Sequence, residues 1–263
     1  MNYPTAAALG TTDIEPTLPP LDALPIARFE PAALREARIV GFDTRNIAAR
    51  PFNLLRTKVA KKCAENDWSV IGVTSTEPAA GKSFVALNLA AALAKVGNVP
   101  IYLIDLDLAR GSIAQSFGVI PEYGLSDYLE GEGDDFAAIG WRVDDSNLGV
   151  FPTRRGAANT AELLTGPRFA QFIAAVRART QPSLVIVDLP PTFANDDAMI
   201  IAQHLDAYMM VVHSGKTTKR QLTESCAMLE PTPLLGMVLN RYDGGFADPY
   251  GYNNYSKAYA NYY

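Results

Sequence analysis

The sequence predicts an α/β fold in which a mostly parallel, twisted sheet carries helices on both faces. Two patterns indicate this fold: short apolar runs recur along the chain, and segments with helical spacing separate them. The runs do not alternate with polar residues, so we expect strands that are buried on both sides, as in parallel sheets. A third observation agrees, because 263 residues, 48% of them hydrophobic, suffice for one large domain with a buried core.

The regular elements are expected to begin after a proline-rich N-terminal part. Residues 1–38 contain six prolines and show no periodicity, so we expect them to form a mostly disordered arm. Residues 39–42 are expected to form a short strand or an extended lead-in. Helical spacing then follows at Phe52, Leu55, Val59 and Cys63.

Apolar strands and helices are expected to alternate from residue 68 onward. The expected strands are 68–73, 100–104, 149–151, 184–187, 207–212 and 234–239, and the expected helices are 82–96, 168–177, 196–204 and 216–229. The helix over 82–96 is apolar on nearly every side, which indicates packing against the sheet. From Tyr242 onward glycine, asparagine and tyrosine replace the pattern. We therefore expect a folded domain over 39–241 and a flexible tail over 242–263.

Composition and charge narrow the function classes. The net charge is −5 and no basic run occurs, which argues against nucleic acid as the main partner. Cys63 and Cys226 lie far apart and lack the spacing of metal ligands, so we interpret them as reduced thiols. Residues 1–9 lack the positive and apolar regions of a secretory signal, and no apolar run reaches the ~18–20 residues of a membrane span. These features predict a cytoplasmic protein.

A phosphate-binding loop is expected between the first strand and the helix that follows it. The segment Ser75-Thr76-Glu77-Pro78-Ala79-Ala80-Gly81-Lys82-Ser83 has the strand–loop–helix context of a P-loop, although Thr76 stands where the pattern GxxxxGK[ST] has its first glycine. Lys82 would reach the β- and γ-phosphates of ATP, and the Ser83 hydroxyl would bind Mg²⁺. The expected contacts to ATP or ADP are Glu77, Pro78, Ala79, Ala80, Gly81, Lys82, Ser83 and Phe84.

Three carboxylates follow two of the expected strands. Asp105 and Asp107 come directly after the run 101–104, and Asp188 ends the run that begins at 184. Residues at i and i+2 near the end of a strand point the same way, here toward the ligand edge of an open α/β sheet. One of the first two acids would hold Mg²⁺ while the other accepts a hydroxyl proton, and a pair of solvated turn acids is the alternative. Asp188 would orient Mg²⁺ or its water.

Tyrosines gather at the C-terminus. Seven of the twelve tyrosines lie in the last 22 residues: Tyr242, Tyr250, Tyr252, Tyr255, Tyr259, Tyr262 and Tyr263. A nucleotide site and a tyrosine-dense tail on one chain suggest an enzyme that carries its own phosphate acceptor. The alternative is a sticky, disordered segment that is prone to self-association.

The motifs together resemble those of the bacterial tyrosine kinases of capsule and exopolysaccharide synthesis, which are related to the MinD/ParA ATPases. The resemblance rests on the loop 75–83, on Ile104-Asp105-Leu106-Asp107, on Val187-Asp188-Leu189-Pro190-Pro191 and on the tyrosine tail. Further stretches that look like this family are 124–129, 161–164, 214–218 and 238–241. The resemblance covers roughly residues 39–263 and implies a P-loop NTPase fold of the deviant Walker type.

The resemblance implies an ATP-dependent protein-tyrosine autokinase that regulates polysaccharide synthesis and export. The implied catalytic residues are Lys82, Asp105 and Asp107, the implied Mg²⁺ ligands are Ser83, Asp107 and Asp188, and Asn240 or Arg241 would lie near the adenine. The implied phosphate acceptors are Tyr250, Tyr252, Tyr255, Tyr259, Tyr262 and Tyr263.

The resemblance also implies partners. The tail would be phosphorylated by a neighbouring subunit in a ring, and the phosphorylated protein would be a monomer. A phosphotyrosine phosphatase would reverse the reaction. Because no membrane span is found, a separate membrane activator of the polysaccharide co-polymerase type would recruit the chain to the inner membrane.

The sequence departs from the family pattern in two places. Where the family reads Asp-x-Asp-x-Arg, Ala109 occupies the arginine position and Arg110 follows it. In the family's subunit-contact pattern Glu-x-x-Arg-x-x-Arg, the corresponding positions are occupied here by Arg50, Asn53 and Arg56, so the glutamate and the first arginine are replaced. A slow homologue, a non-catalytic nucleotide-binding regulator and a MinD/ParA-like regulatory ATPase therefore stay open. The last of these predicts a lysine at position 77, where this chain has a glutamate.

Overall fold

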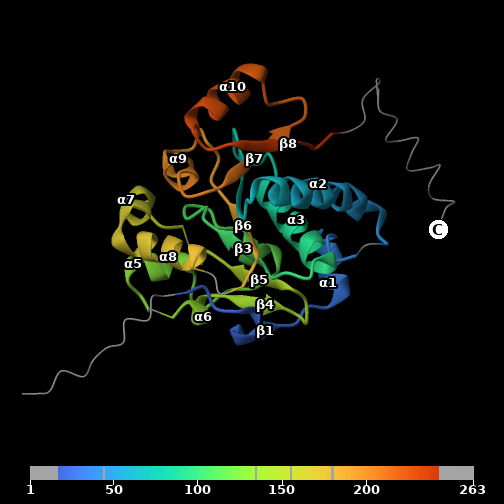
Figure 1. The fold of residues 1–263 in the computed structure, drawn as a ribbon, viewed down its shortest axis with the longest axis vertical. Helices are drawn as coiled ribbons and strands as arrows, with labels where there is room; N and C mark the ends of the chain where they lie inside the picture. The colour runs from blue at the N-terminus through green and yellow to red at the C-terminus, as the bar shows by residue number, and fades with distance from the viewer. Residues whose placement is uncertain (1–16, 44, 134, 155, 179–180, 243–263) are drawn as a thin grey trace, which may run out of the picture.

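A mostly parallel sheet forms the centre of the fold (Figure 1). The computed structural model describes residues 17–242 except 44, 134, 155 and 179–180. Within these residues the sheet has eight strands in the order β1-β4-β5-β3-β6-β2-β7-β8, and every neighbouring pair is parallel except β4 and β5. The strands are β1 (Ile26–Ala27), β2 (Val70–Ser75), β3 (Ile101–Asp105), β4 (Trp141–Val143), β5 (Leu148–Phe151), β6 (Leu184–Asp188), β7 (Ala207–His213) and β8 (Leu234–Asn240). The predicted fold class is confirmed.

Helices cover both faces of this sheet. On one face α2 and α3 pack over a cluster that includes Val59 and Leu89, and on the other face α5, α8 and α9 pack over a cluster that includes Phe172 and Ile201 (Figure 1). The α-helices in the described residues are α1 (Pro31–Glu36), α2 (Arg50–Asn66), α3 (Lys82–Val96), α4 (Ile113–Ser116), α5 (Leu125–Glu130), α6 (Phe136–Ile139), α7 (Thr160–Thr165), α8 (Pro167–Arg177), α9 (Asp197–Ala202) and α10 (Lys219–Met228). No helix among these residues is both long and apolar enough to cross a bilayer.

The order of the strands determines which loops meet at the carboxyl edge of the sheet, where the site is predicted. β2 lies between β6 and β7, β3 lies on the other side of β6, and all four run in the same direction. All six residues of β2 and all five of β3 and of β6 are buried, as their apolar sequences predict. Because parallel strands end at one edge, the loops that follow β2, β3 and β6 meet there.

The predicted strands and longer helices are present, with ends that differ by up to three residues. β1 and β4, which have two and three residues, were not predicted from the sequence. β4 contains Arg142 between Trp141 and Val143, so its apolar character does not form a run. Such short strands are recognised only through their neighbours, because propensity says little over two or three residues.

The prediction of a disordered arm over residues 1–38 is wrong for residues 17–38. Leu18, Leu21 and Leu24 are buried in the cluster that also holds Tyr102, whose hydroxyl donates to the Pro19 carbonyl at 3.0 Å. β1 then pairs with β4 at the edge of the sheet. The prolines were misleading, since three regularly spaced leucines bury enough apolar surface to order the segment.

Residues 39–42, which follow this segment, lie over α3 and form no strand. The side-chain oxygen of Asn88 on α3 accepts the N–H groups of Val40 at 2.7 Å and Gly41 at 3.0 Å. A Cβ at Gly41 would meet the backbone of α3, which explains the glycine. Residues 39–42 are therefore a lead-in, fixed by a helix side chain and not by a sheet.

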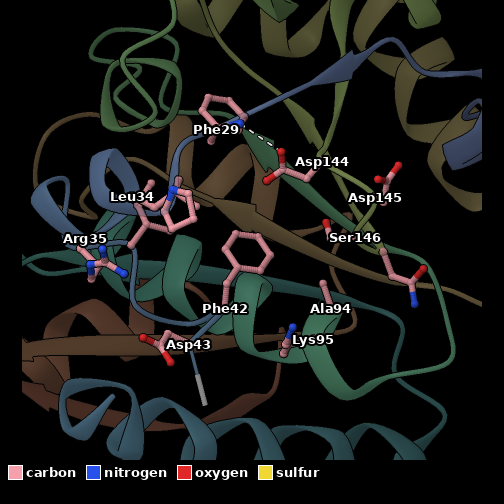
Figure 2. A pocket seen from close by; sticks show the side chains of 13 residues that line it. Phe29, Leu34, Arg35, Phe42, Asp43, Ala94, Lys95, Asp144, Asp145 and Ser146 are labelled. Atoms are coloured by element: carbon pink, nitrogen blue, oxygen red, sulfur yellow. Dashed lines mark hydrogen bonds between the residues drawn. The ribbon is translucent and has the colours of Figure 1, made fainter. Parts of the chain in front are cut away.

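The same N-terminal segment lines one side of a cavity of about 610 Å³ at the amino edge of the sheet (Figure 2). Figure 2 shows Leu34 and Phe42 on one side of this cavity and Asp144 and Asp145 on the other, with the Phe29 N–H donating to Asp144 at 3.0 Å. The C-terminal end of α3 lines the cavity through Ala94 and Lys95. Since α3 begins at the phosphate loop, this cavity and the loop lie at opposite ends of one helix.

Candidate nucleotide site

The expected phosphate loop connects β2 to α3. Gly81 precedes the helix with a left-handed backbone (φ 95), and Asn240 of β8 lies against its Cα so closely that a Cβ would collide with the amide nitrogen. The same amide group donates to the Ala80 carbonyl at 2.8 Å. Asn240, which was expected near the adenine, therefore supports the loop itself, and only glycine fits at position 81.

Lys82 lies at the centre of the expected acids. Its ammonium group is 2.8 Å from Asp107, 3.2 Å from Asp188 and 3.2 Å from the Ser83 hydroxyl, which itself hydrogen-bonds Asp188. Burial alone would lower the pKa of Lys82, but the carboxylates of Asp188 and Asp107 raise it above its usual value. Burial also raises the pKa of Asp188, against the opposing effect of Lys82. The structure thus brings Lys82, Ser83, Asp107 and Asp188 together.

Asp105 lies beneath this group and has a different environment. Its side chain is completely buried and accepts backbone N–H groups from Asp107 at 3.2 Å, Ser112 at 3.0 Å and Ile113 at 3.1 Å. Burial, with the nearby charge of Asp188, raises its pKa to about 8. The loop 107–113 wraps around this carboxyl group, so Asp105 shapes the loop that presents Asp107.

A cavity of about 530 Å³ opens in front of Lys82. The expected Pro78, Ala79, Gly81, Ser83 and Phe84 line one side of it. The rest of the lining comes from residues that were not predicted as nucleotide contacts: Ala109, Arg110, Ser112, Pro190, Pro191, Ala194 and Asn195. All of these follow β3 or β6, so their position after strand ends was the available signal.

Two loop residues have buried oxygens without a hydrogen-bond partner in the described part of the chain. They are Thr76, through its hydroxyl, and Glu77, through one carboxylate oxygen that lies 4.0 Å from His213. Both belong to the phosphate loop. A buried polar atom without a partner is unfavourable, so we expect a ligand or water to complete these contacts.

Ala79 is in a strained conformation. Its φ of 63 lies in the left-handed region, which glycine adopts without a steric penalty. We expect Ala79→Gly to raise the free energy of unfolding by up to about 1 kcal/mol, because the removed strain exceeds the entropy that glycine adds to the unfolded chain. Urea unfolding checks this. The matched control is the buried Ala80, where glycine should destabilise by about 0.5–1 kcal/mol. Equal changes at both positions would contradict the strain argument.

The remaining expected site residues are less informative. Arg241 is exposed at the end of β8, and the acceptor tyrosines from Tyr250 onward lie outside the described residues. Within the described part of the chain no group of three His, Cys, Asp or Glu side chains could hold a metal ion alone. A P-loop Mg²⁺ site does not require one, since phosphate oxygens and water supply most of its ligands.

The loop geometry and the acids at the ends of β3 and β6 define a nucleotide-binding domain of the P-loop class. The chain belongs to the family described as CobQ/CobB/MinD/ParA nucleotide binding domain, which matches residues 71–259.

Its curated relatives include tyrosine kinases. Tyrosine-protein kinase wzc of Salmonella typhimurium is 30% identical over 215 residues, which are 80% of this chain and 29% of the relative. Tyrosine-protein kinase etk of Escherichia coli K12 is 30% identical over 195 residues, 73% of this chain and 26% of the relative. Succinoglycan biosynthesis transport protein ExoP of Rhizobium meliloti is 32% identical over 243 residues, 87% of this chain and 30% of the relative. The chain thus spans less than a third of these relatives.

Solved structures agree with this relationship. The kinase domain of Escherichia coli tyrosine kinase ETK has a TM-score of 0.68 and 27% identity, covering 80% of this chain and 83% of that one. The chimerical protein CapA2B2 has a TM-score of 0.71 and 25% identity, covering 86% and 95%. The septum site-determining protein MinD of Pyrococcus horikoshii, solved with Mg-ADP, has a TM-score of 0.54 and 20% identity, covering 68% and 72%, so it supports the fold alone.

Proposed function

We propose that this chain is an ATP-dependent protein-tyrosine kinase that phosphorylates its own C-terminal tyrosines and regulates exopolysaccharide synthesis. The observation that carries the proposal is the buried contact of Lys82 with Asp107 and Asp188 below an open cavity, in a chain related to tyrosine kinases. Phosphoryl transfer depends mainly on positioning and charge neutralisation, which this group of residues can supply.

The residues present fit a magnesium nucleotide. Lys82 is already held by carboxylates, Ser83 contacts Asp188, and the buried Thr76 hydroxyl of the loop has no hydrogen-bond partner in the described part of the chain. Ser83 and Asp188 would hold Mg²⁺, which would neutralise phosphate charge when bound. Lys82 would turn from the carboxylates to the terminal phosphates, and the loop N–H groups would bind the remaining oxygens.

Asp107 is the better candidate for the group that accepts the tyrosine proton. It lines the cavity, whereas Asp105 is enclosed and bonded to three backbone N–H groups. Once Lys82 moves to the phosphates, Asp107 would be free to accept the proton or to share in binding Mg²⁺. Asp105 would act as a positioning residue in either case.

The acceptor and the partners belong to the proposal as well. Six tyrosines from Tyr250 to Tyr263 would receive phosphate from a neighbouring subunit, and a phosphatase would remove it. Each phosphotyrosine adds about −1.5 to −2 charge, so a phosphorylated tail would be repelled from an acidic site. A membrane protein of the polysaccharide co-polymerase type would activate the chain; the relative ExoP, named a succinoglycan biosynthesis transport protein, supports a role in polysaccharide synthesis.

The test is incubation of the purified protein with labelled ATP and Mg²⁺, followed by mapping of phosphotyrosine. We expect label on the tail. Replacing the seven tyrosines from Tyr242 onward by phenylalanine should remove at least about 90% of this label, a tenfold loss, because the variant lacks every proposed acceptor hydroxyl. Co-expression with a membrane protein of the polysaccharide co-polymerase type guards against an inactive preparation. Release of phosphate without tail label would favour the regulatory ATPase, and binding without turnover would favour the non-catalytic regulator.

A further inference from the structure

The loop between β6 and α9 forms one wall of the nucleotide cavity. The residues of this loop that line the cavity are Pro190, Pro191, Ala194 and Asn195. Every side chain from 189 to 195 is uncharged, so this wall supplies no cation for phosphate oxygens. The phosphate loop already provides a lysine and backbone N–H groups for that purpose. The wall is therefore available to the second molecule of the reaction, the one that receives the phosphate.

Hydrogen bonds hold this loop firmly against the end of β2. The Thr192 N–H donates to the Ser75 carbonyl at 2.9 Å. The next N–H group along the chain, that of Phe193, donates to the Thr76 carbonyl at 3.2 Å. The Thr192 hydroxyl also shares a hydrogen bond of 2.7 Å with the Ser225 hydroxyl on α10, and both side chains are completely buried. A loop that is fixed in this way loses little conformational entropy when another molecule binds to it.

The tip of the loop is nevertheless exposed. Phe193 is 41% exposed, and its neighbours Ala194 and Asn195 are exposed as well. The Asn195 amide nitrogen donates to the carboxylate of Asp197 at 2.7 Å, and this buried carboxylate also accepts the Thr160 hydroxyl at 2.9 Å. Because the nitrogen is held by Asp197, the carbonyl oxygen is the group that Asn195 offers to a molecule in the cavity.

We propose that residues 193–195 bind the segment that carries the acceptor tyrosine. The Phe193 ring would lie against the tyrosine ring, a contact that aromatic pairs favour, and the Asn195 carbonyl oxygen would accept a backbone N–H of the segment. The occupant is the tail over residues 250–263, which carries six tyrosines. Its one charged side chain is Lys257, so an uncharged wall suits it better than a charged one.

This inference rests on the proposed function, because it names the place where the acceptor of that reaction binds. Asp107 lines the same cavity and would take the hydroxyl proton, whereas an amide such as Asn195 takes none. The loop tip would thus determine the affinity for the acceptor and the position of its ring, and Asp197 and Thr160 would be positioning residues.

Binding of a synthetic peptide with the sequence of residues 250–263 tests this assignment without turnover. The peptide carries a fluorescent label, and its anisotropy is measured with the full-length chain in the presence of ADP and Mg²⁺. We expect Phe193→Ala/Asn195→Ala to raise the Kd for the peptide at least about fivefold, because a ring contact and a hydrogen bond are lost. The Kd for ADP·Mg²⁺ should change by less than about twofold, since the phosphate loop is unaltered.

The matched control is Tyr123→Ala/Asn66→Ala, which removes an exposed ring and an exposed amide that do not line the cavity. This control should bind the peptide as tightly as the unaltered chain does. Phe193→Tyr keeps the ring and should also retain the affinity. A peptide in which alanine replaces every tyrosine should bind weakly, and equally to the unaltered chain and to Phe193→Ala, because the ring contact is absent in both cases.

Equal affinity of the tyrosine peptide for the unaltered chain and for Phe193→Ala/Asn195→Ala, or binding to neither, would overturn the assignment. An equal loss of affinity for the peptide and for ADP·Mg²⁺ would also overturn it, since the tip would then serve the nucleotide. Labelling of the tail by ATP is a separate measurement. Label without any effect of the tip on peptide binding would leave the proposed function intact, and the expected loss of binding without label would leave a tail-binding site and refute the kinase.

Discussion

Replacement of Lys82 by methionine is expected to lower phosphoryl transfer by at least about a hundredfold and to destabilise the nucleotide-free protein by about 3–5 kcal/mol. The first effect follows from the loss of the cation that would neutralise the terminal phosphates. The second follows from the ion pairs in the folded chain, where Asp107 at 2.8 Å and Asp188 at 3.2 Å would lose their partner. Labelled ATP measures the first effect, and urea unfolding measures the second.

The destabilisation should depend on pH in a defined direction. Without Lys82, the folded-state pKa of Asp188, already raised by burial, would rise further. When a carboxyl group has a raised folded-state pKa, the free energy of unfolding falls as pH increases toward that pKa. The reason is that the unfolded chain has already released the proton that the folded chain still holds. The difference between Lys82→Met and the unaltered protein should therefore be larger at pH 8 than at pH 5.

A second substitution separates charge from packing. Lys82→Met combined with Asp107→Asn removes one of the two carboxylates and should recover part of the lost stability but none of the transfer activity. Lys95→Met, at the exposed end of α3, is the matched control and should change stability by less than about 0.5 kcal/mol. If the single and double variants were equally unstable, the cost would come from packing and not from unpaired charge.

The sequence was sufficient for the parts of the site that follow strand ends. Lys82, Asp107 and Asp188 each come directly after an apolar run or the loop behind it, and parallel strands bring such positions to one edge. It was not sufficient to distinguish Asp105 from Asp107. That difference arises because the chain folds back at Ser112 and Ile113 and directs two N–H groups to Asp105, a tertiary contact without a local pattern.

The N-terminal segment is a second part of the fold that the sequence alone did not predict. Its prolines and its lack of periodicity favoured disorder, yet Leu18, Leu21 and Leu24 are buried. Those leucines become informative only when the apolar surface beside β5 is known, since Leu21 and Leu24 lie against Gly149. Asn88 was visible as a polar residue within an apolar helix, but the sequence did not indicate which segment it binds.

Replacement of Asn88 by leucine is expected to destabilise the protein by about 2–4 kcal/mol, although leucine has nearly the same size and suits a buried helix. The Asn88 side chain accepts from Val40 and Gly41, and it donates to the carbonyl groups of Arg38 at 3.1 Å and Phe84 at 3.0 Å. Leucine would leave two N–H groups without a partner, and such groups cost about 1–3 kcal/mol each when buried. Urea unfolding measures the loss, and limited proteolysis should show earlier cleavage within residues 17–43.

The matched control is Asn66→Leu, because Asn66 is an exposed helix residue whose side chain donates to the Lys62 carbonyl, and its change should stay within about 0.5 kcal/mol. Gly41→Ala provides an independent route to the same contact, since a Cβ there would press on the backbone of α3. Both variants should release the N-terminal segment before the sheet unfolds, because they break its attachment and leave β2, β3 and β6 intact. If Asn88→Leu were as stable as the unaltered protein, the leucines around Leu21 would hold the segment without this attachment.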